Sequence, residues 1–409
     1  MLYHLYEMQR ASLAPMRLLA HSALSLMEAP FNPLRPTPMG RLAVAALDTF
    51  EHSTRSFGKP AFGHDETVIG NKPARVVEQV IESRSWCDLV HFRRLPGPKP
   101  AETQPKVLMV APMSGHFATL LRGTVEAFLP DHEVYVTDWR NARDVPLMAP
   151  DFDLDDYVEY VMDFLRLLGP DTHVIAVCQP AVPVLAAVAL LNAREPEAAP
   201  RSMTLIGGPI DTREGPTAVN DFAKRHNMEW FRANTIHRVP FGHGGFLREV
   251  YPGFLQLAGF MAMNLDRHME AHWQMFLHLV EGDGEPLAAK RAFYEEYRAV
   301  MDLNAAFYLQ TIEAVFHEHL LPRGLLTFRG DRVDPAAIRH TALLTIEGER
   351  DDISGLGQTR AAHKLTPNLP DEMKQHWEQP GVGHYGLFNG RRFRSDVAPR
   401  IKAFITRHG

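Results

Sequence analysis

The chain has 409 residues, a mass of 46.1 kDa and a formal net charge of −6 at pH 7. At about 150 residues per domain, this length suits two or three domains, or one large α/β domain with an insertion. Hydrophobic residues make up 45% and charged residues 22%, which excludes disordered and fibrous classes. The negative charge offers no basic surface for a phosphate backbone, so we expect no nucleic-acid partner.

Membrane insertion and secretion are also disfavoured. The longest apolar stretch, residues 181–191, is shorter than the roughly 18 to 20 residues that a membrane span needs. Two cysteines, Cys87 and Cys178, are too few for a disulfide framework, and no secretory leader is recognisable at the N-terminus. We therefore expect a cytoplasmic protein without a membrane span.

Residues 1–95 are expected to form an N-terminal extension of two helices and a β-hairpin. The first helix is amphipathic, because apolar residues recur at spacings of three and four: Leu13, Met16, Ala20, Ala23 and Met27. A second helix is expected near residues 40–55. Two β-rich runs, 75–82 and 86–92, are close enough to pair and join a sheet.

Strands and helices then alternate over residues 96–211. Short buried strands are predicted at 106–112, 133–137, 173–177 and 202–206, with helices between them. The alternation lapses over residues 212–335, an aromatic-rich stretch that we expect to be a helical cap. It returns over 336–409. This pattern predicts a mostly parallel α/β sheet with helices on both faces, interrupted by the cap.

The junction at Cys178 is the most informative place in the chain. It follows the strand HVIAV and precedes an apolar helix, so its side chain is expected to project above the sheet, beside free helix N–H groups. Such a position favours a negatively charged thiolate. On this junction alone, a nucleophile and a buried small hydrophobe fit equally well. Ala176 and Pro180 stand where an elbow motif has glycines.

Two further loops supply partners in the order that hydrolases of this architecture use. Asp351 and Asp352 follow the strand at 342–346, and His384 lies in a glycine-rich loop after the last strand. We expect a triad of Cys178, Asp351 and His384. Adjacent carboxylates are not separated by spacing, and the choice of Asp351 over Asp352 comes from the family resemblance given below.

An oxyanion site is expected beside the nucleophile. One N–H comes from Gln179, and a second comes from the loop at 112–116 that follows the apolar run KVLMVA, with Met113 or Ser114 as donor. His116 in the same loop is interpreted as structural.

We predict no metal and no nucleotide. The histidines His317 and His319 lack the spacing of a helical zinc site, and His268 and His272 have it without a complete zinc motif. The glycines Gly355 and Gly357 lack the third glycine of a dinucleotide loop.

Five motifs resemble the bacterial intracellular poly(3-hydroxybutyrate) (PHB) depolymerases. They are APMSGH at 111–116, TDWRNAR at 137–143, AVCQPAVP at 176–183, EGERDDISG at 347–355 and PGVGHYGLFNG at 380–390. The resemblance spans nearly the whole chain. It implies an α/β-hydrolase fold in which Cys178 is the nucleophile, Asp351 the acid and His384 the base.

The resemblance also implies the reaction. The ester bonds of PHB are cleaved through an acyl-cysteine intermediate, which releases 3-hydroxybutyrate units or oligomers to water, or 3-hydroxybutyryl-CoA if coenzyme A is the acceptor. No other cofactor is implied. The family is similar to the polyhydroxyalkanoate synthases, but this chain lacks their G-x-C-x-G motif, so degradation is favoured over synthesis. A small-ester thioesterase and a non-catalytic granule protein remain as alternatives.

The expected partner is the PHB granule surface in the cytoplasm, and the oligomeric state is left open between a monomer and a dimer. Three aromatic residues are candidates for binding the polyester: Trp139, Trp230 and Phe231. For the two cap residues, Trp230 and Phe231, packing in the core of the cap is the competing interpretation.

Overall fold

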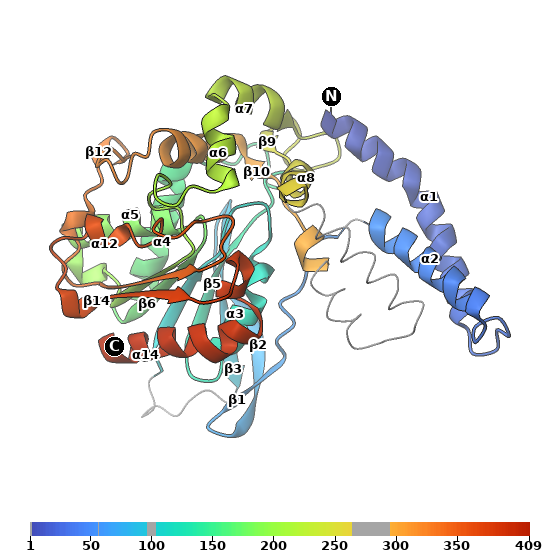
Figure 1. Ribbon diagram of the computed structural model, residues 1–409, viewed down its shortest axis with the longest axis horizontal. Helices are drawn as coiled ribbons and strands as arrows, with labels where there is room; N and C mark the ends of the chain where they lie inside the picture. Colours follow the sequence, from blue (N-terminus) through green and yellow to red (C-terminus); the bar gives the residue numbers. More distant parts are fainter. Residues whose placement is uncertain (1, 56, 96–103, 264–294) are drawn as a thin grey trace.

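A computed structural model describes residues 2–55, 57–95, 104–263 and 295–409. Figure 1 shows a central sheet between helices, a group of helices above it, and a pair of N-terminal helices that projects to one side.

Nine strands of the described chain form the central sheet, in the order β1-β2-β3-β5-β4-β6-β7-β13-β14. Their bounds are β1 Glu66–Ile69, β2 Lys72–Ser83, β3 Cys87–Leu95, β4 Lys106–Val110, β5 Glu133–Trp139, β6 Thr172–Val177, β7 Ser202–Ile206, β13 Ala342–Gly348 and β14 Lys374–Gln379. From β5 to β14 all neighbours are parallel, and β3 is antiparallel to both of its neighbours. The chain has the α/β-hydrolase fold, as expected.

Helices cover both faces of the sheet. On one face α3 (Arg122–Phe128) lies beside α14 (Ala398–His408), and on the other α4 (Leu154–Leu168) lies beside α5 (Ala181–Arg194). The helix α5 is apolar all round and is buried over most of its length, as a helix enclosed by other elements must be. Strands β6, β7 and β13 are buried throughout, which explains their continuous apolar sequences.

In the described part of the insertion between β7 and β13, short strands accompany the helices. Its helices are α6 Ala218–Arg225, α7 Met228–Thr235, α8 Gly253–Met263 and α11 Ala305–Thr311, followed by a π-helical turn at Ile312–His317. It also holds the small sheets β10-β9-β8 and β11-β12. Their bounds are β8 His237–Arg238, β9 Glu249–Tyr251, β10 Leu303–Asn304, β11 Thr327–Phe328 and β12 Asp331–Arg332. Strands of two or three residues are too short to show an alternating pattern in the sequence.

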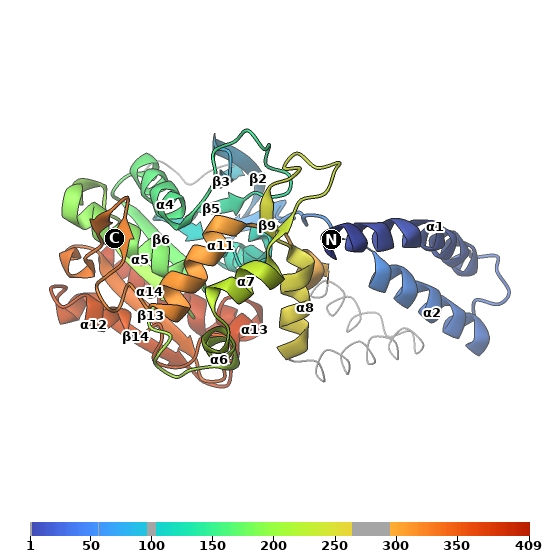
Figure 2. The same cartoon turned by 90° about the horizontal axis from the view of Figure 1, so that it is seen from above.

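The N-terminal extension contains the expected helices, α1 (Leu2–Glu28) and α2 (Pro38–Thr54). Its hairpin β2–β3 joins the central sheet through β5. In the described chain the start of α1 packs on the cap, where Tyr3 Oη donates to Asp302 Oδ2 at 2.5 Å and Tyr6 stacks on Phe254. Most of α1 and α2 pack on each other and extend away from the body (Figure 2). Within the expected apolar stripe of α1, Met16 is an exception, because it is exposed.

The remaining short helices, α12 (Ala362–Leu365) and α13 (Gly390–Arg392), lie in the C-terminal part of the chain. Among the helices that the structure describes, none is both long enough and apolar enough to cross a membrane. His268 and His272 lie outside the described residues.

Candidate active site

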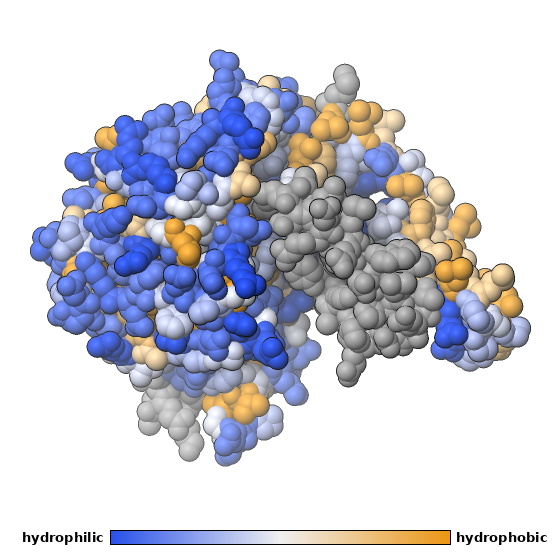
Figure 3. Space-filling model, viewed as in Figure 1, coloured by the Kyte–Doolittle hydropathy of each residue, from blue (hydrophilic) through white to orange (hydrophobic). Residues whose placement is uncertain are grey.

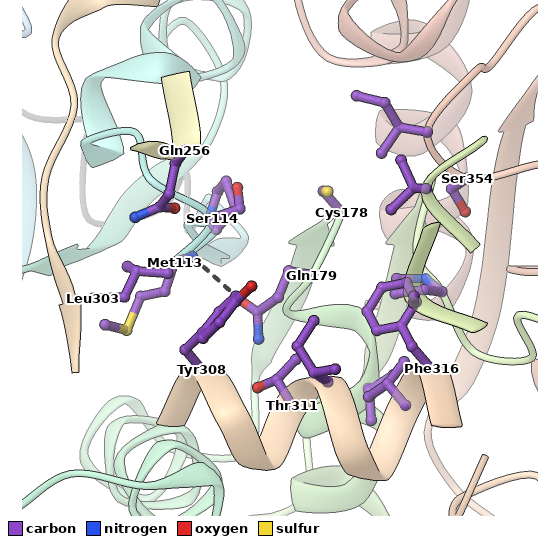
Figure 4. Close-up of a pocket in the computed structure, with 18 of the residues that line it drawn as sticks. Met113, Ser114, Cys178, Gln179, Gln256, Leu303, Tyr308, Thr311, Phe316 and Ser354 are labelled. Atoms are coloured by element: carbon purple, nitrogen blue, oxygen red, sulfur yellow. Dashed lines mark hydrogen bonds between the residues drawn. The ribbon is translucent and has the colours of Figure 1, made fainter. Parts of the chain in front are cut away.

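Cys178 occupies a sharp turn between β6 and α5. Its φ is +69°, a left-handed conformation that is rare for a residue other than glycine. The turn is held by a hydrogen bond from Cys178 N–H to Ile206 O at 2.7 Å. Pro180 precedes the first residue of α5, where a proline costs no helical hydrogen bond. Figure 4 shows the sulfur directed into a cavity. The strand–turn–helix expected at this cysteine is therefore present.

The structure brings Asp351 and His384 together. Both follow strands whose carboxyl ends lie at the same edge of the sheet as that of β6. His384 Nδ1 and Asp351 Oδ2 are hydrogen-bonded at 2.7 Å, and both side chains are almost fully buried. The second carboxylate oxygen, Oδ1, accepts from the N–H groups of Ile353 and Ser354, each at 2.9 Å. Asp352, by contrast, is exposed.

His384 also interacts with Cys178. Burial of the imidazole by itself lowers the pKa of His384, but the charges of Asp351 and Cys178 and hydrogen bonds to both raise that pKa well above its ordinary value. The imidazole thus lies between a carboxylate and a thiol. This arrangement can move a proton between Cys178 and His384 while Asp351 fixes the orientation of the ring.

The candidate oxyanion donors lie beside Cys178. Met113 and Ser114 line the same cavity as the cysteine. The Met113 N–H donates to Gln179 Oε1 at 3.2 Å, which is the dashed line in Figure 4. In the protein without substrate, the Gln179 side chain therefore holds the amide that we expect to bind an oxyanion.

A cavity of about 540 Å³ opens above Cys178. Its walls come from the loop after β4, the start of α5, the cap helices α6, α7 and α11, and the loop that holds His384. Most of the lining is apolar, and it includes these side chains of the cap: Phe222, Phe231, Tyr251, Leu303, Phe307, Tyr308, Ile312 and Phe316. The cavity suits an apolar acyl chain.

Of the three predicted polyester-binding residues, Phe231 alone lines this cavity. Trp139 is a correction: it is buried in the sheet, where its ring stacks on Tyr157 and its Nε1–H donates to Ala111 O at 2.9 Å. Trp230 does not line this cavity and packs against Phe222, His226 and Phe231, as the competing interpretation of packing within the cap predicts. Both aromatic rings are used in packing, which their sequence positions do not reveal.

His116 is buried, and its Nε2 is hydrogen-bonded to Tyr297 O at 3.0 Å. Burial lowers the pKa of His116 to about 4, so the ring is neutral at pH 7. This environment agrees with the structural role expected for it. Among the residues that the structure describes, no group of three or more potential metal ligands is placed to hold an ion.

Two glycines of the site were missed by sequence reasoning. Gly207 has a φ of +55°, and a Cβ there would lie 3.1 Å from His384 Cε1 and 3.3 Å from Asp351 Oδ2. A Cβ on Gly208 would lie 2.1 Å from the Cβ of Ala181, at the start of α5. The pair directly follows β7, which lies beside β6 in the sheet, and this adjacency is the signal that locates them.

Residues 207–409 match the protein family described as "PHB de-polymerase C-terminus". The C-terminal half of the chain belongs to the PHB depolymerase family. This half carries Asp351 and His384, whereas Cys178 precedes it. The family and the fold together support an ester hydrolase, and the resemblance found in the motifs is confirmed.

The chain is also similar to solved structures. They include an esterase from Thermogutta terrifontis (16% identity, covering 82% of this chain and 100% of that one, TM-score 0.41). A hydrolase of 2-hydroxy-6-oxo-6-phenylhexa-2,4-dienoate from Rhodococcus sp. strain RHA1 gives 11% identity, 81% and 99% coverage, and a TM-score of 0.42. A hypothetical protein from Pseudomonas aeruginosa is 12% identical, with 87% of this chain and 99% of that chain covered and a TM-score of 0.47. The comparison with curated proteins gave no match.

Proposed function

We propose that this PHB depolymerase family member cleaves the ester bonds of PHB through a triad of Cys178, His384 and Asp351. The observation that supports this most strongly is the buried His384, hydrogen-bonded to Asp351 and interacting with Cys178 at the base of an apolar cavity. The cysteine provides the nucleophile, the histidine the base and the aspartate the group that orients the imidazole.

The reaction begins when His384 takes the proton of Cys178 and the sulfur attacks the ester carbonyl. The carbonyl oxygen becomes an oxyanion, which accepts hydrogen bonds from the N–H groups of Gln179 and of Met113 or Ser114. The C–O bond then breaks, and His384 gives its proton to the departing hydroxyl end of the polyester. An acyl-cysteine thioester remains on the enzyme.

Release of the acyl group needs an acceptor. Water, deprotonated by His384, attacks the thioester. The C–S bond breaks, Cys178 leaves as a thiolate that can take the proton back from His384, and a 3-hydroxybutyrate unit or oligomer with a free carboxylate is released. A thiol acceptor such as coenzyme A reacts at similar cost, because one thioester replaces another, and it gives 3-hydroxybutyryl-CoA. In this proposal no other cofactor takes part.

The proposed partner is the surface of a PHB granule in the cytoplasm. The helices α1 and α2 and the turn between them expose these large apolar side chains: Leu5, Met8, Leu18, Leu19, Leu26, Phe31 and Met39. Figure 3 shows hydrophobic surface, in orange, along this helical pair. An exposed apolar surface of this kind suits contact with a polyester surface.

The proposal is tested by comparing wild type and Cys178→Ala on amorphous PHB granules and on a short soluble ester. We expect wild type to release soluble 3-hydroxybutyrate from granules and Cys178→Ala to release none while still binding them. Full activity of Cys178→Ala would overturn the triad.

The same assay separates the alternative functions. Activity on short esters or thioesters alone would indicate a small-ester enzyme, and granule binding without any ester cleavage a coat protein. Chain growth from 3-hydroxybutyryl-CoA would indicate a synthase-like acyltransferase.

A further inference from the structure

The peptide group of Ala111 is held on both sides by buried side chains. Its carbonyl oxygen accepts hydrogen bonds from Trp139 Nε1–H at 2.9 Å and from Tyr157 Oη–H at 3.1 Å. Its N–H donates to Thr137 Oγ1 at 2.9 Å. All three side chains are almost completely buried. Burial also raises the pKa of Tyr157 well above its ordinary value, so its hydroxyl keeps the proton that it donates.

Two donors on one carbonyl use both of its lone pairs and fix the direction of the C=O bond. The donors come from different elements, since Trp139 ends β5 and Tyr157 lies in α4. Their rings stack with centroids 4.2 Å apart, so each ring restrains the other. Such a carbonyl has little freedom to rotate.

The next residue, Pro112, transmits this direction. Proline has no N–H, and its ring fixes φ near −65°. Once the plane of the Ala111–Pro112 peptide is held, the ψ angle of Pro112 is the one backbone torsion left to vary before the following peptide, whose N–H belongs to Met113. That N–H points to Gln179, the neighbour of Cys178, at the base of the cavity.

We propose that Trp139 and Tyr157 are positioning residues that hold Ala111 and, through Pro112, aim the Met113 N–H at the oxyanion of the reaction. The inference rests on the proposed function and adds the residues that orient its oxyanion donor. An oxyanion donor acts over 2.7–3.1 Å and weakens as its angle departs from linear, so a small rotation of Ala111 costs rate.

The test variant is Tyr157→Phe, which keeps the stacked ring and removes one donor. We expect kcat for a short soluble ester to fall about tenfold with KM little changed, because the oxyanion forms only after binding. The matched control is Tyr160→Phe. Tyr160 lies one turn further along α4, and its ring also contacts Trp139, with centroids 5.9 Å apart. The Tyr160 hydroxyl does not bond to Ala111, so the kcat of Tyr160→Phe should stay within about twofold of wild type.

A second readout separates positioning from general damage. Alkylation of Cys178 by iodoacetamide passes through no oxyanion, so Tyr157→Phe should keep the wild-type alkylation rate at Cys178, measured by peptide mass. Equal kcat for Tyr157→Phe and Tyr160→Phe would overturn the inference. So would a rise in KM alone, or a loss of alkylation in step with kcat.

Trp139→Phe, which removes the other donor, replaces Tyr157→Phe if the latter does not fold. If neither folds, the two side chains act in stability and the inference is overturned. The proposed function fails separately: it falls if Cys178→Ala stays active, whatever Tyr157→Phe does.

Discussion

At Cys178 the backbone adopts a φ of +69° without help from glycines at positions 176 and 180. A left-handed conformation costs a residue with a Cβ about 1–2 kcal/mol, and packing around the turn must offset this. Gly208 provides the room, because any side chain there would overlap the start of α5. The small residue that this turn requires is therefore Gly208, which follows the neighbouring strand β7. The sequence next to Cys178 does not reveal it.

The two adjacent carboxylates should differ sharply in their effect on rate. Asp351→Asn leaves His384 without the negative charge that orients and stabilises its imidazolium, so we expect kcat to fall on the order of a hundredfold or more. Asp352→Asn is the matched control, since Asp352 is exposed and should stay within about twofold of wild type. Steady-state kinetics on a short soluble ester measure both. Loss of activity in Asp352→Asn alone would reverse the assignment.

The cap helix α7 places two neighbouring aromatic rings in different environments. Phe231 lines the cavity and Trp230 packs behind it. We expect Phe231→Leu to raise KM for a long acyl ester by about three- to tenfold, because apolar wall is lost where the chain binds. Trp230→Leu should leave that KM unchanged and lower the melting temperature. Equal KM values in the two variants would show that Phe231 is cap core only.

The helical pair α1–α2 should act in granule binding and not in bond cleavage. Leu18→Glu with Leu19→Glu places two charges on its exposed apolar surface, so we expect several-fold weaker sedimentation with PHB granules. Cleavage of a short soluble ester should not change. Leu167→Glu, at an exposed leucine of α4, is the matched control. Granule binding that is unaffected by the double substitution would show that this surface does not bind the granule.

Acid should destabilise the whole fold through its buried histidines. Burial lowers the pKa values of His116, His173 and His363 to about 4, from an ordinary 6.5. Between these values the unfolded chain binds more protons, so the free energy of unfolding falls as pH drops, by up to about 1.4 kcal/mol per pH unit per histidine. Because the pKa of His384 is raised, this residue changes the free energy of unfolding only above pH 6.5, outside the range from about pH 4 to 6.5 in which the other three histidines act.

Urea unfolding at pH 7, 6 and 5 measures this slope. The His173→Gln variant removes one of the three titrations and should show a shallower dependence on pH. A free energy of unfolding that is constant or increases toward pH 5 would contradict the account.

The sequence predicts the architecture well because each element has a clear physical pattern. Buried parallel strands such as β6 and β13 are continuous apolar runs, and Asp351 and His384 follow strands, so their order along the chain indicates one sheet edge. Roles that depend on contacts between residues far apart in the chain are not predicted from the sequence. Trp139 is suited equally to binding polyester and to holding Ala111, and only the packing of α4 against the sheet separates these roles.

The role of Cys178 as nucleophile is tested by looking for the acyl group on Cys178 itself. Wild-type protein is mixed with a soluble 3-hydroxybutyrate ester, quenched in acid during turnover and mapped by peptide mass spectrometry. The proposed triad predicts a 3-hydroxybutyryl group on the peptide that contains Cys178. Hydroxylamine should remove this group, as it removes thioesters, and the group should be absent in Cys178→Ala. An acyl group on another residue, or full turnover by Cys178→Ala, would contradict the proposed triad.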